Sequence, residues 1–190
     1  MFGLPYPLMV LDWQLPGIFR LHMTFSGLGA IALPCAWLTR GRNVHRAIGR
    51  AAFGLLLLGA CAAMPCALAS PAAPIARLGF FVQGALCILF LVQGLRSIRA
   101  DNAFRHQRYM AYATAVVFGV VPLRIATFAV ARSDLPFDAA YSLMAWMSWL
   151  LPLIGVFWWQ RQKGFGMPVI DGRWKLVRRH TTPLVEKPPF

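Results

Sequence analysis

The chain has 190 residues, of which 58% are apolar and only 13% are charged, and it carries a formal net charge of +13. A soluble domain of this size could not bury so much apolar surface, so we expect lipid to cover part of it. The arginines lie mainly in short loops between apolar runs. This placement favours contact with anionic lipid headgroups and a fixed membrane orientation, and it argues against nucleic-acid binding.

Residues 1–16 are predicted to form an interfacial N-terminal segment. They lack the basic start of a signal peptide, and Pro5, Pro7 and Pro16 are expected to interrupt any early helix. The aromatic ring of Trp13 suits the level of the lipid headgroups.

Residues 17–159 are predicted to form an all-α, polytopic bundle of five transmembrane helices. Each apolar run is near the roughly 20 residues that cross a hydrocarbon core of about 30 Å. Pro65 lies one turn before the end of the second run and is expected to kink it. The expected spans are Gly17–Leu38, Ala47–Ala69, Ile75–Leu95, Arg108–Ala131 and Ala139–Trp159.

The distribution of lysine and arginine predicts the orientation of the spans. Fifteen of these residues fall on one side, in the loops at 39–50 and 96–108 and in the tail, and three fall on the other side. The remaining one, Arg124, lies inside the fourth span, away from its ends. Because cytoplasmic loops carry the excess of basic residues, we expect the N-terminus outside and the C-terminus inside.

Residues 160–190 are predicted to leave the membrane as a basic cytoplasmic tail. Trp174, Leu176 and Val177 alternate with arginine and lysine, a pattern that suits a short element lying on the anionic inner leaflet. Docking to another subunit is the alternative interpretation of this tail.

Arg124 and His22 form a first group of candidate site residues. A charged side chain within a span is costly to bury and is therefore a functional candidate. Helix length places Arg124 in the outer third of the fourth span and His22 near the outer border of the first, so the two can share a depth. Arg124 would then donate to an anion, a propionate or a carbonyl group. The alternative is that its long side chain only reaches for water.

His45 and His106 form a second group, at the inner ends of the second and fourth spans. Two histidines from facing helices at one depth are what bis-imidazole ligation of haem b requires, so these two are the candidate metal ligands. Met110 follows His106 by one helical turn and shares its face. Haem propionates, a phospholipid phosphate or a quinone headgroup could bind the neighbouring arginines, or these could be plain interfacial anchors. They are Arg46, Arg50, Arg105 and Arg108.

Other chemistry is not indicated by the sequence. None of the six acidic residues lies in the middle of a span, which argues against a proton-coupled transporter. There is no phosphate-binding loop, serine-hydrolase elbow or zinc-protease motif. The four cysteines lie in apolar runs without metal-ligand spacing and are expected to pack between helices; they are Cys35, Cys61, Cys66 and Cys87.

Several of these motifs together resemble a family of small bacterial membrane proteins catalogued as domain of unknown function 2306, over about residues 20–160. The matching residues are His22, His45-Arg46-x-x-Gly49-Arg50, Ile98-Arg99, His106 with Met110, Arg124, and Tyr141 followed by Trp146 and Trp149. The resemblance implies a membrane protein with a site at its histidines and Arg124, without a known reaction or ligand.

These observations lead to one main functional hypothesis and one alternative. The main hypothesis is an integral protein of the bacterial cytoplasmic membrane that holds haem b or a quinone at its histidine and arginine residues for electron transfer. The alternative is a non-catalytic subunit of a membrane complex, or a lipid-binding scaffold, that docks a partner through its basic cytoplasmic face. A carrier of a small anion ranks lower because no two corresponding spans are visibly broken.

Overall fold

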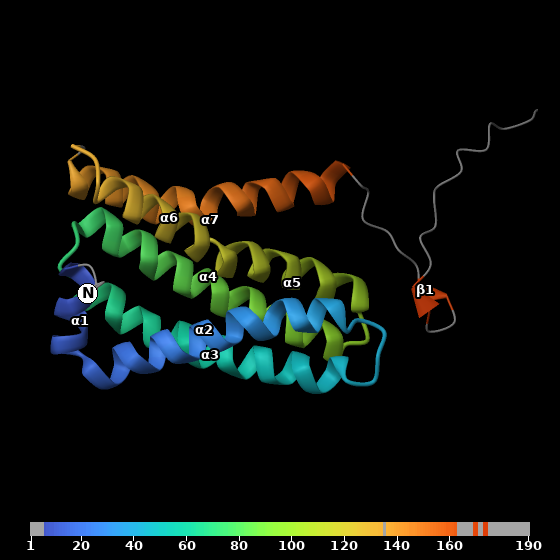
Figure 1. The fold of residues 1–190 in the computed structure, drawn as a ribbon. Coiled ribbons are helices and arrows are strands. Elements are labelled where there is room, and N and C mark those ends of the chain that lie inside the picture. The colour runs from blue at the N-terminus through green and yellow to red at the C-terminus, as the bar shows by residue number, and fades with distance from the viewer. Residues whose placement is uncertain (1–5, 135, 163–168, 171–172, 175–190) are drawn as a thin grey trace, which may run out of the picture.

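The computed structural model describes residues 6–134, 136–162, 169–170 and 173–174. Over this part of the chain the helices lie side by side along one long dimension (Figure 1). The elements are α1 (Tyr6–Gln14), α2 (Pro16–Leu38), α3 (His45–Ala69), α4 (Pro74–Arg99), α5 (Ala103–Phe118), α6 (Val120–Val130), α7 (Phe137–Gln162), β1 (Val169–Ile170) and β2 (Arg173–Trp174).

Five segments are long and apolar enough to cross a membrane, with α5 and α6 together forming the fourth. The predicted all-helical bundle with five spans is therefore confirmed. Several helices run beyond the predicted apolar limits, as α3 does at His45 and α4 does at Arg99. A helix keeps its backbone hydrogen bonds in the headgroup region, so polar residues extend it past the hydrocarbon core.

The two ends of the bundle differ in charge. We call one the basic end; it carries the arginine-rich loops after α2 and α4 and the C-terminal end of α7 (Figure 1). We call the other the opposite end; it carries the loops after α3 and α6 and the short helix α1.

The core lies among α2, α3, α4 and α5, each of which contacts two of the others, and α7 packs beside α4 and α5. Large apolar side chains on the outside, such as Ile31, Ile125 and Leu143, are more than 60% exposed. That surface is what a lipid-covered bundle presents. The buried core cluster comprises Leu33, Leu56, Ala60, Cys87, Leu91, Ala113 and Val116.

α2 and α3 approach most closely where Ser26 meets Gly59. A Cβ added to Gly59 would lie 2.8 Å from the Ser26 backbone nitrogen and 2.5 Å from its Oγ. Small residues permit this close packing of helix backbones in membranes.

The fourth span is interrupted at Gly119, between α5 and α6. Pro122 has no N–H to donate to the carbonyl of Phe118, so the helix loses one of its regular bonds there. Gly119 lies against α7, where an added Cβ would come within 2.9 Å of the Ser148 carbonyl oxygen and the Trp149 Cα. Among the described residues, the backbone of α6 comes close only to α5 and α7, so α6 turns away from the backbones of α2, α3 and α4 (Figure 1).

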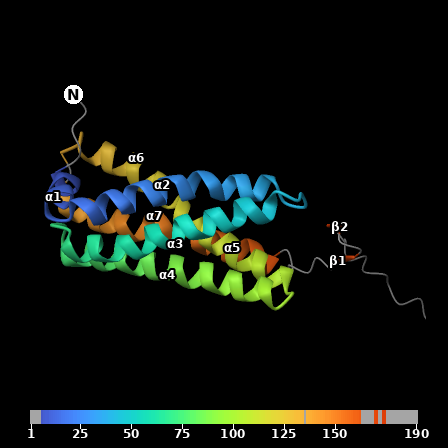
Figure 2. The ribbon, with the colours of Figure 1, turned by 90° about the horizontal axis from the view of Figure 1, so that it is seen from below.

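The prolines were expected to interrupt any early helix, and the structure has such a break at Pro16 but not at Pro7. α1 forms with Pro7 in its first turn, where a missing N–H costs nothing, and it ends just before Leu15 and Pro16. α1 lies across the opposite end of the bundle rather than along it (Figures 1 and 2). Asp12 accepts two hydrogen bonds from Arg20, at 3.0 and 3.3 Å, and so ties α1 to α2.

α3 continues as a helix through Pro65. In the tail, the described strands β1 and β2 pair antiparallel, with Val169 opposite Trp174. The rest of the predicted basic tail lies outside the described residues.

Gly59→Ala is expected to lower the stability of the bundle by about 1–3 kcal/mol, because the new methyl group meets the Ser26 backbone. The measurement is thermal unfolding of detergent-solubilised protein, followed by circular dichroism. Gly54→Ala is the matched control on the same helix, since nothing lies within 4 Å of its added Cβ. An unchanged melting temperature in Gly59→Ala would contradict the close packing of α2 on α3.

The charge difference between the ends predicts that the C-terminus faces the cytoplasm, so green fluorescent protein fused there is expected to fluoresce in cells. The same prediction places the loop after α6 outside, so alkaline phosphatase inserted after Ser133 is expected to be active. The reverse pattern of the two reporters would show that the predicted orientation is inverted.

Candidate functional site

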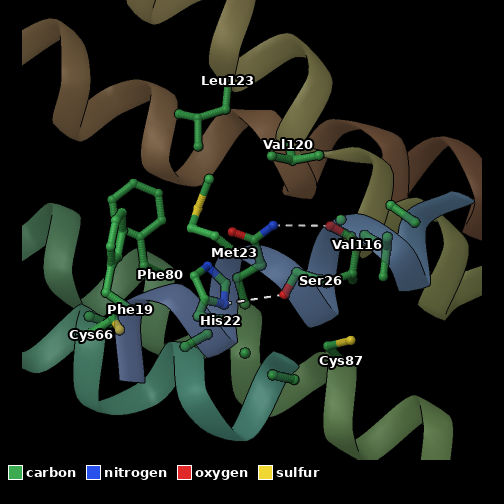
Figure 3. Close-up of a pocket in the computed structure, with 18 of the residues that line it drawn as sticks. Phe19, His22, Met23, Ser26, Cys66, Phe80, Cys87, Val116, Val120 and Leu123 are labelled. Atoms are coloured by element: carbon green, nitrogen blue, oxygen red, sulfur yellow. Dashed lines mark hydrogen bonds between the residues drawn. The ribbon is translucent and has the colours of Figure 1, made fainter. Parts of the chain in front are cut away.

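A cavity of about 310 Å³ lies in the half of the bundle toward the opposite end. We call it the His22 cavity. In Figure 3, His22 and Ser26 of α2 lie on one side of it, and Val120 and Leu123 of α6 lie across from them. The divergence of α6 from α2, α3 and α4 leaves this space open.

Most of the lining is apolar, with a small polar group set into it. Leu8 and Leu11 of α1 cover the end of the cavity, and Leu56 and Val116 line it toward the core. The polar side chains come from α2, α4, α6 and α7 and from the turn after α3; they are His22, Ser26, Ser70, Gln83, Arg124 and Tyr141. The small residues Ala63 and Cys66 of α3 also line the cavity.

The ring orientation of His22 is set by α3. Its Nδ1 lies 3.0 Å from the Gly59 carbonyl oxygen. It also lies 3.2 Å from Ser26 Oγ, a contact drawn in Figure 3. A carbonyl oxygen can only accept, so Nδ1 carries the hydrogen and donates to it, while Nε2 keeps a lone pair. The neutral imidazole therefore has a free basic nitrogen.

Arg124 lies at the mouth of the cavity, where α6 and α2 face each other without close backbone contact among the described residues. Its side chain is exposed, and its Nη2 lies 4.0 Å from Met23 Sδ on α2. This contact with sulfur is weak, so the N–H donors of the Arg124 guanidinium remain available for a stronger acceptor.

Gln83 and Tyr141 complete the polar group. Gln83 Nε2 donates to the Val116 carbonyl oxygen at 3.0 Å, which fixes its amide against α5 (Figure 3). The Tyr141 ring stacks on Phe137 at 5.4 Å and contacts Phe80 at 5.6 Å between ring centres. These ring contacts hold the Tyr141 side chain in place at the cavity wall.

His45 and His106 both lie at the basic end, each bonded to a neighbouring helix. His45 Nδ1 donates to the Ala36 carbonyl oxygen of α2 at 2.9 Å, and His106 Nδ1 donates to the Gly94 carbonyl oxygen of α4 at 2.9 Å. As in His22, the Nε2 atoms keep their lone pairs. This is the arrangement in which a histidine commonly binds a metal.

Met110 shares the face of His106, as the spacing predicts, and packs against α4. A Cβ added to Gly94 would come within 2.2 Å of Met110 Cε, so the thioether fills the notch that the glycine leaves. This contact gives Met110 a packing role.

Arg108 projects toward a different helix from His106. Its Nε donates to Gln160 Oε1 of α7 at 3.2 Å, whereas His106 faces α4. Arg108 is thus bound to α7 rather than to either histidine. Arg46 and Arg50 are exposed on the first turns of α3. Within the described part of the chain, no three His, Cys, Asp or Glu side chains form a group that could hold a metal ion.

The core side chains near the basic-end histidines are tightly packed. Trp37 crosses from α2 to α5, where its Nε1 donates to Thr114 Oγ1 at 3.1 Å, and it packs on the core cluster together with Phe53 and Met110. A ligand bound between His45 and His106 would have to lie among these side chains, whereas the His22 cavity already provides space.

Sequence reasoning missed Ser70 and Gln83 as site residues and left Tyr141 outside the site. Gln83 is an amide in an otherwise apolar run, which is a usable signal because a polar group in a span is costly without a partner. Ser70 lies just after α3 and carries no comparable signal.

A family model described as Predicted membrane protein (DUF2306) matches residues 19–159. The chain matches no curated protein and no solved structure. The matched region runs from α2 to α7 and contains all of the candidate site residues. Because the match covers well over half of its length, the chain belongs to the DUF2306 family of predicted membrane proteins.

Proposed function

We propose that the protein binds a quinone or quinol headgroup in the His22 cavity and serves electron transfer in the bacterial cytoplasmic membrane. The observation that carries this proposal is an apolar cavity of about 310 Å³ in which a free imidazole nitrogen, a phenol and a guanidinium line one space. Apolar pockets with a few convergent polar groups are the usual form of small-molecule sites.

The shape of the cavity suits a lipid-soluble ligand. Its mouth lies between α2 and α6, on the side of the bundle that lipid covers, with exposed Met23 and Arg124 at its edge. A quinone ring that enters there leaves its hydrocarbon tail in the bilayer. The tail stays in the bilayer because moving it into water would cost about 0.8 kcal/mol for each CH₂ group.

The polar groups match both redox forms of such a ring. Arg124 and Tyr141 can donate to a quinone carbonyl oxygen, and His22 Nε2 can accept a hydrogen bond from a quinol hydroxyl group. A simple anion would use Arg124 but would find no second cation lining the cavity among the described residues. This difference favours a neutral ring that carries oxygen atoms.

Arg124→Gln is expected to weaken binding of decylubiquinone about tenfold to hundredfold, because a charge-assisted hydrogen bond is lost. The measurement is isothermal titration calorimetry in detergent. His22→Phe keeps a ring in place but removes the acceptor, so it should weaken binding of the reduced quinol more than binding of the quinone.

Arg132→Gln is the matched control, since it removes one positive charge from the same end of the bundle. The Arg132 guanidinium lies 3.3 Å above the Phe128 ring, outside the cavity. Equal losses in the Arg124 and Arg132 variants would contradict the proposed site. If dodecanoate binds more tightly than decylubiquinone, the ligand of the cavity is a carboxylate and the quinone proposal is wrong.

Haem b at His45 and His106 is a second candidate, for one specific reason. Both histidines donate Nδ1–H to a backbone carbonyl and keep Nε2 free, as axial ligands do. The packed side chains of Trp37 and Met110 near this end favour the quinone proposal over it.

This second candidate predicts that protein purified from haem-replete cells shows a reduced-minus-oxidised absorbance difference, which His106→Ala abolishes and Met110→Ala retains. Loss of the axial imidazole removes the ligand field, whereas Met110 only packs on Gly94. A colourless preparation with native helix content would exclude haem and leave the quinone proposal unaffected.

A further inference from the structure

A groove of about 390 Å³ runs between α5 and α7 at the basic end, away from the His22 cavity. Two arginines and three aromatic rings form most of its lining. The lining residues are Phe104, Arg108, Tyr112, Phe157, Gln160 and Arg161.

The Arg108 guanidinium is held in place by several contacts. Its Nε donates to Gln160 Oε1 at 3.2 Å, and Gln160 Nε2 donates back to the Arg108 carbonyl oxygen at 3.4 Å. Its Cζ also lies 5.8 Å from the centre of the Phe104 ring. Gln160 is only 5% exposed, so this pair is a fixed part of the contact between α5 and α7.

Arg161 provides the second positive charge on the other wall. Its Cζ lies 4.9 Å from the centre of the Phe157 ring, within the range of a cation–π contact. No acidic side chain lines the groove among the described residues, so the two charges are not neutralised there.

The groove lies at the level where headgroups meet hydrocarbon. Trp158 and Trp159 flank it on α7 with 62% and 43% of their surfaces exposed, as in an interfacial aromatic belt. Tyr112 lies one turn further into the span than Arg108. Arg108 and Arg161 therefore each have an aromatic ring, Tyr112 or Phe157, one turn further into the span, and Phe104 lies one turn nearer the basic end.

We propose that this groove binds an anionic phospholipid of the leaflet on the basic side. The headgroup phosphate lies between Arg108 and Arg161, and the acyl chains follow Tyr112 and Phe157 along the outside of the bundle. Arginine is suited to phosphate because its planar N–H donors bind two oxygens at once. Two fixed cations without a neighbouring acid select an anionic headgroup over a zwitterionic one.

Native mass spectrometry of the full chain with equal amounts of phosphatidylglycerol and phosphatidylcholine tests the proposal. The wild-type protein is expected to retain phosphatidylglycerol preferentially. Replacing both groove arginines, in Arg108→Gln/Arg161→Gln, is expected to reduce that preference about tenfold to thirtyfold.

Arg42→Gln/Arg99→Gln is the matched control, because it removes two exposed charges from the same end but outside the groove. If the double variant unfolds because it loses the Arg108–Gln160 contact, the single variant Arg161→Gln, which keeps that contact, is measured in its place. Arg161→Lys keeps the charge and should recover most of the preference.

An equal loss in the control would show that the preference reflects the overall charge of this end, and would overturn the proposal. Displacement of the lipid by excess inorganic phosphate alone would also overturn it, because the acyl chains would then contribute nothing. Neither result bears on decylubiquinone binding at the opposite end.

Discussion

Pro122 cannot donate a hydrogen bond to the carbonyl of Phe118, and the position of the candidate site depends on this missing bond. The fourth span divides there, and its outer part, α6, packs on α7 while α2, α3 and α4 continue without it. Gly119 lets the divided span lie directly on Ser148 and Trp149. The His22 cavity is the space that this divergence leaves, and Arg124 reaches its mouth because it is carried on α6.

A second constraint is the bond that each span histidine makes to a neighbouring helix. His22, His45 and His106 donate to carbonyl oxygens of Gly59, Ala36 and Gly94. A glycine or alanine at the acceptor lets the imidazole approach a helix backbone without meeting a bulky side chain. Each bond contributes only about 0.5–1.5 kcal/mol, but it fixes the tautomer as well as the ring orientation. In each of these three histidines, Nε2 therefore keeps a lone pair that can accept a hydrogen bond or bind a metal.

The two ends of the bundle have different physical characters. The opposite end contains the His22 cavity, is covered by α1 and carries acidic as well as basic residues. The basic end is filled by packed side chains within the bundle and carries its arginines on the outside. Arginines at a helix end are typical anchors to headgroups, and an apolar cavity with a few polar groups is the usual form of a ligand site, so the two proposals fall at different ends of the bundle.

The sequence by itself determined the five spans, the uneven distribution of arginine and the family membership, because hydropathy and charge are properties of each segment. It also identified His22 and Arg124 as residues of similar depth, since depth follows from helical rise. Only the tertiary structure decided that Gln83, Ser70 and Tyr141 line the same space, and that Arg108 faces Gln160 rather than the histidines. Those facts depend on helix rotation and on the divergence of α6, which come from side-chain packing between helices and cannot be computed from any one segment.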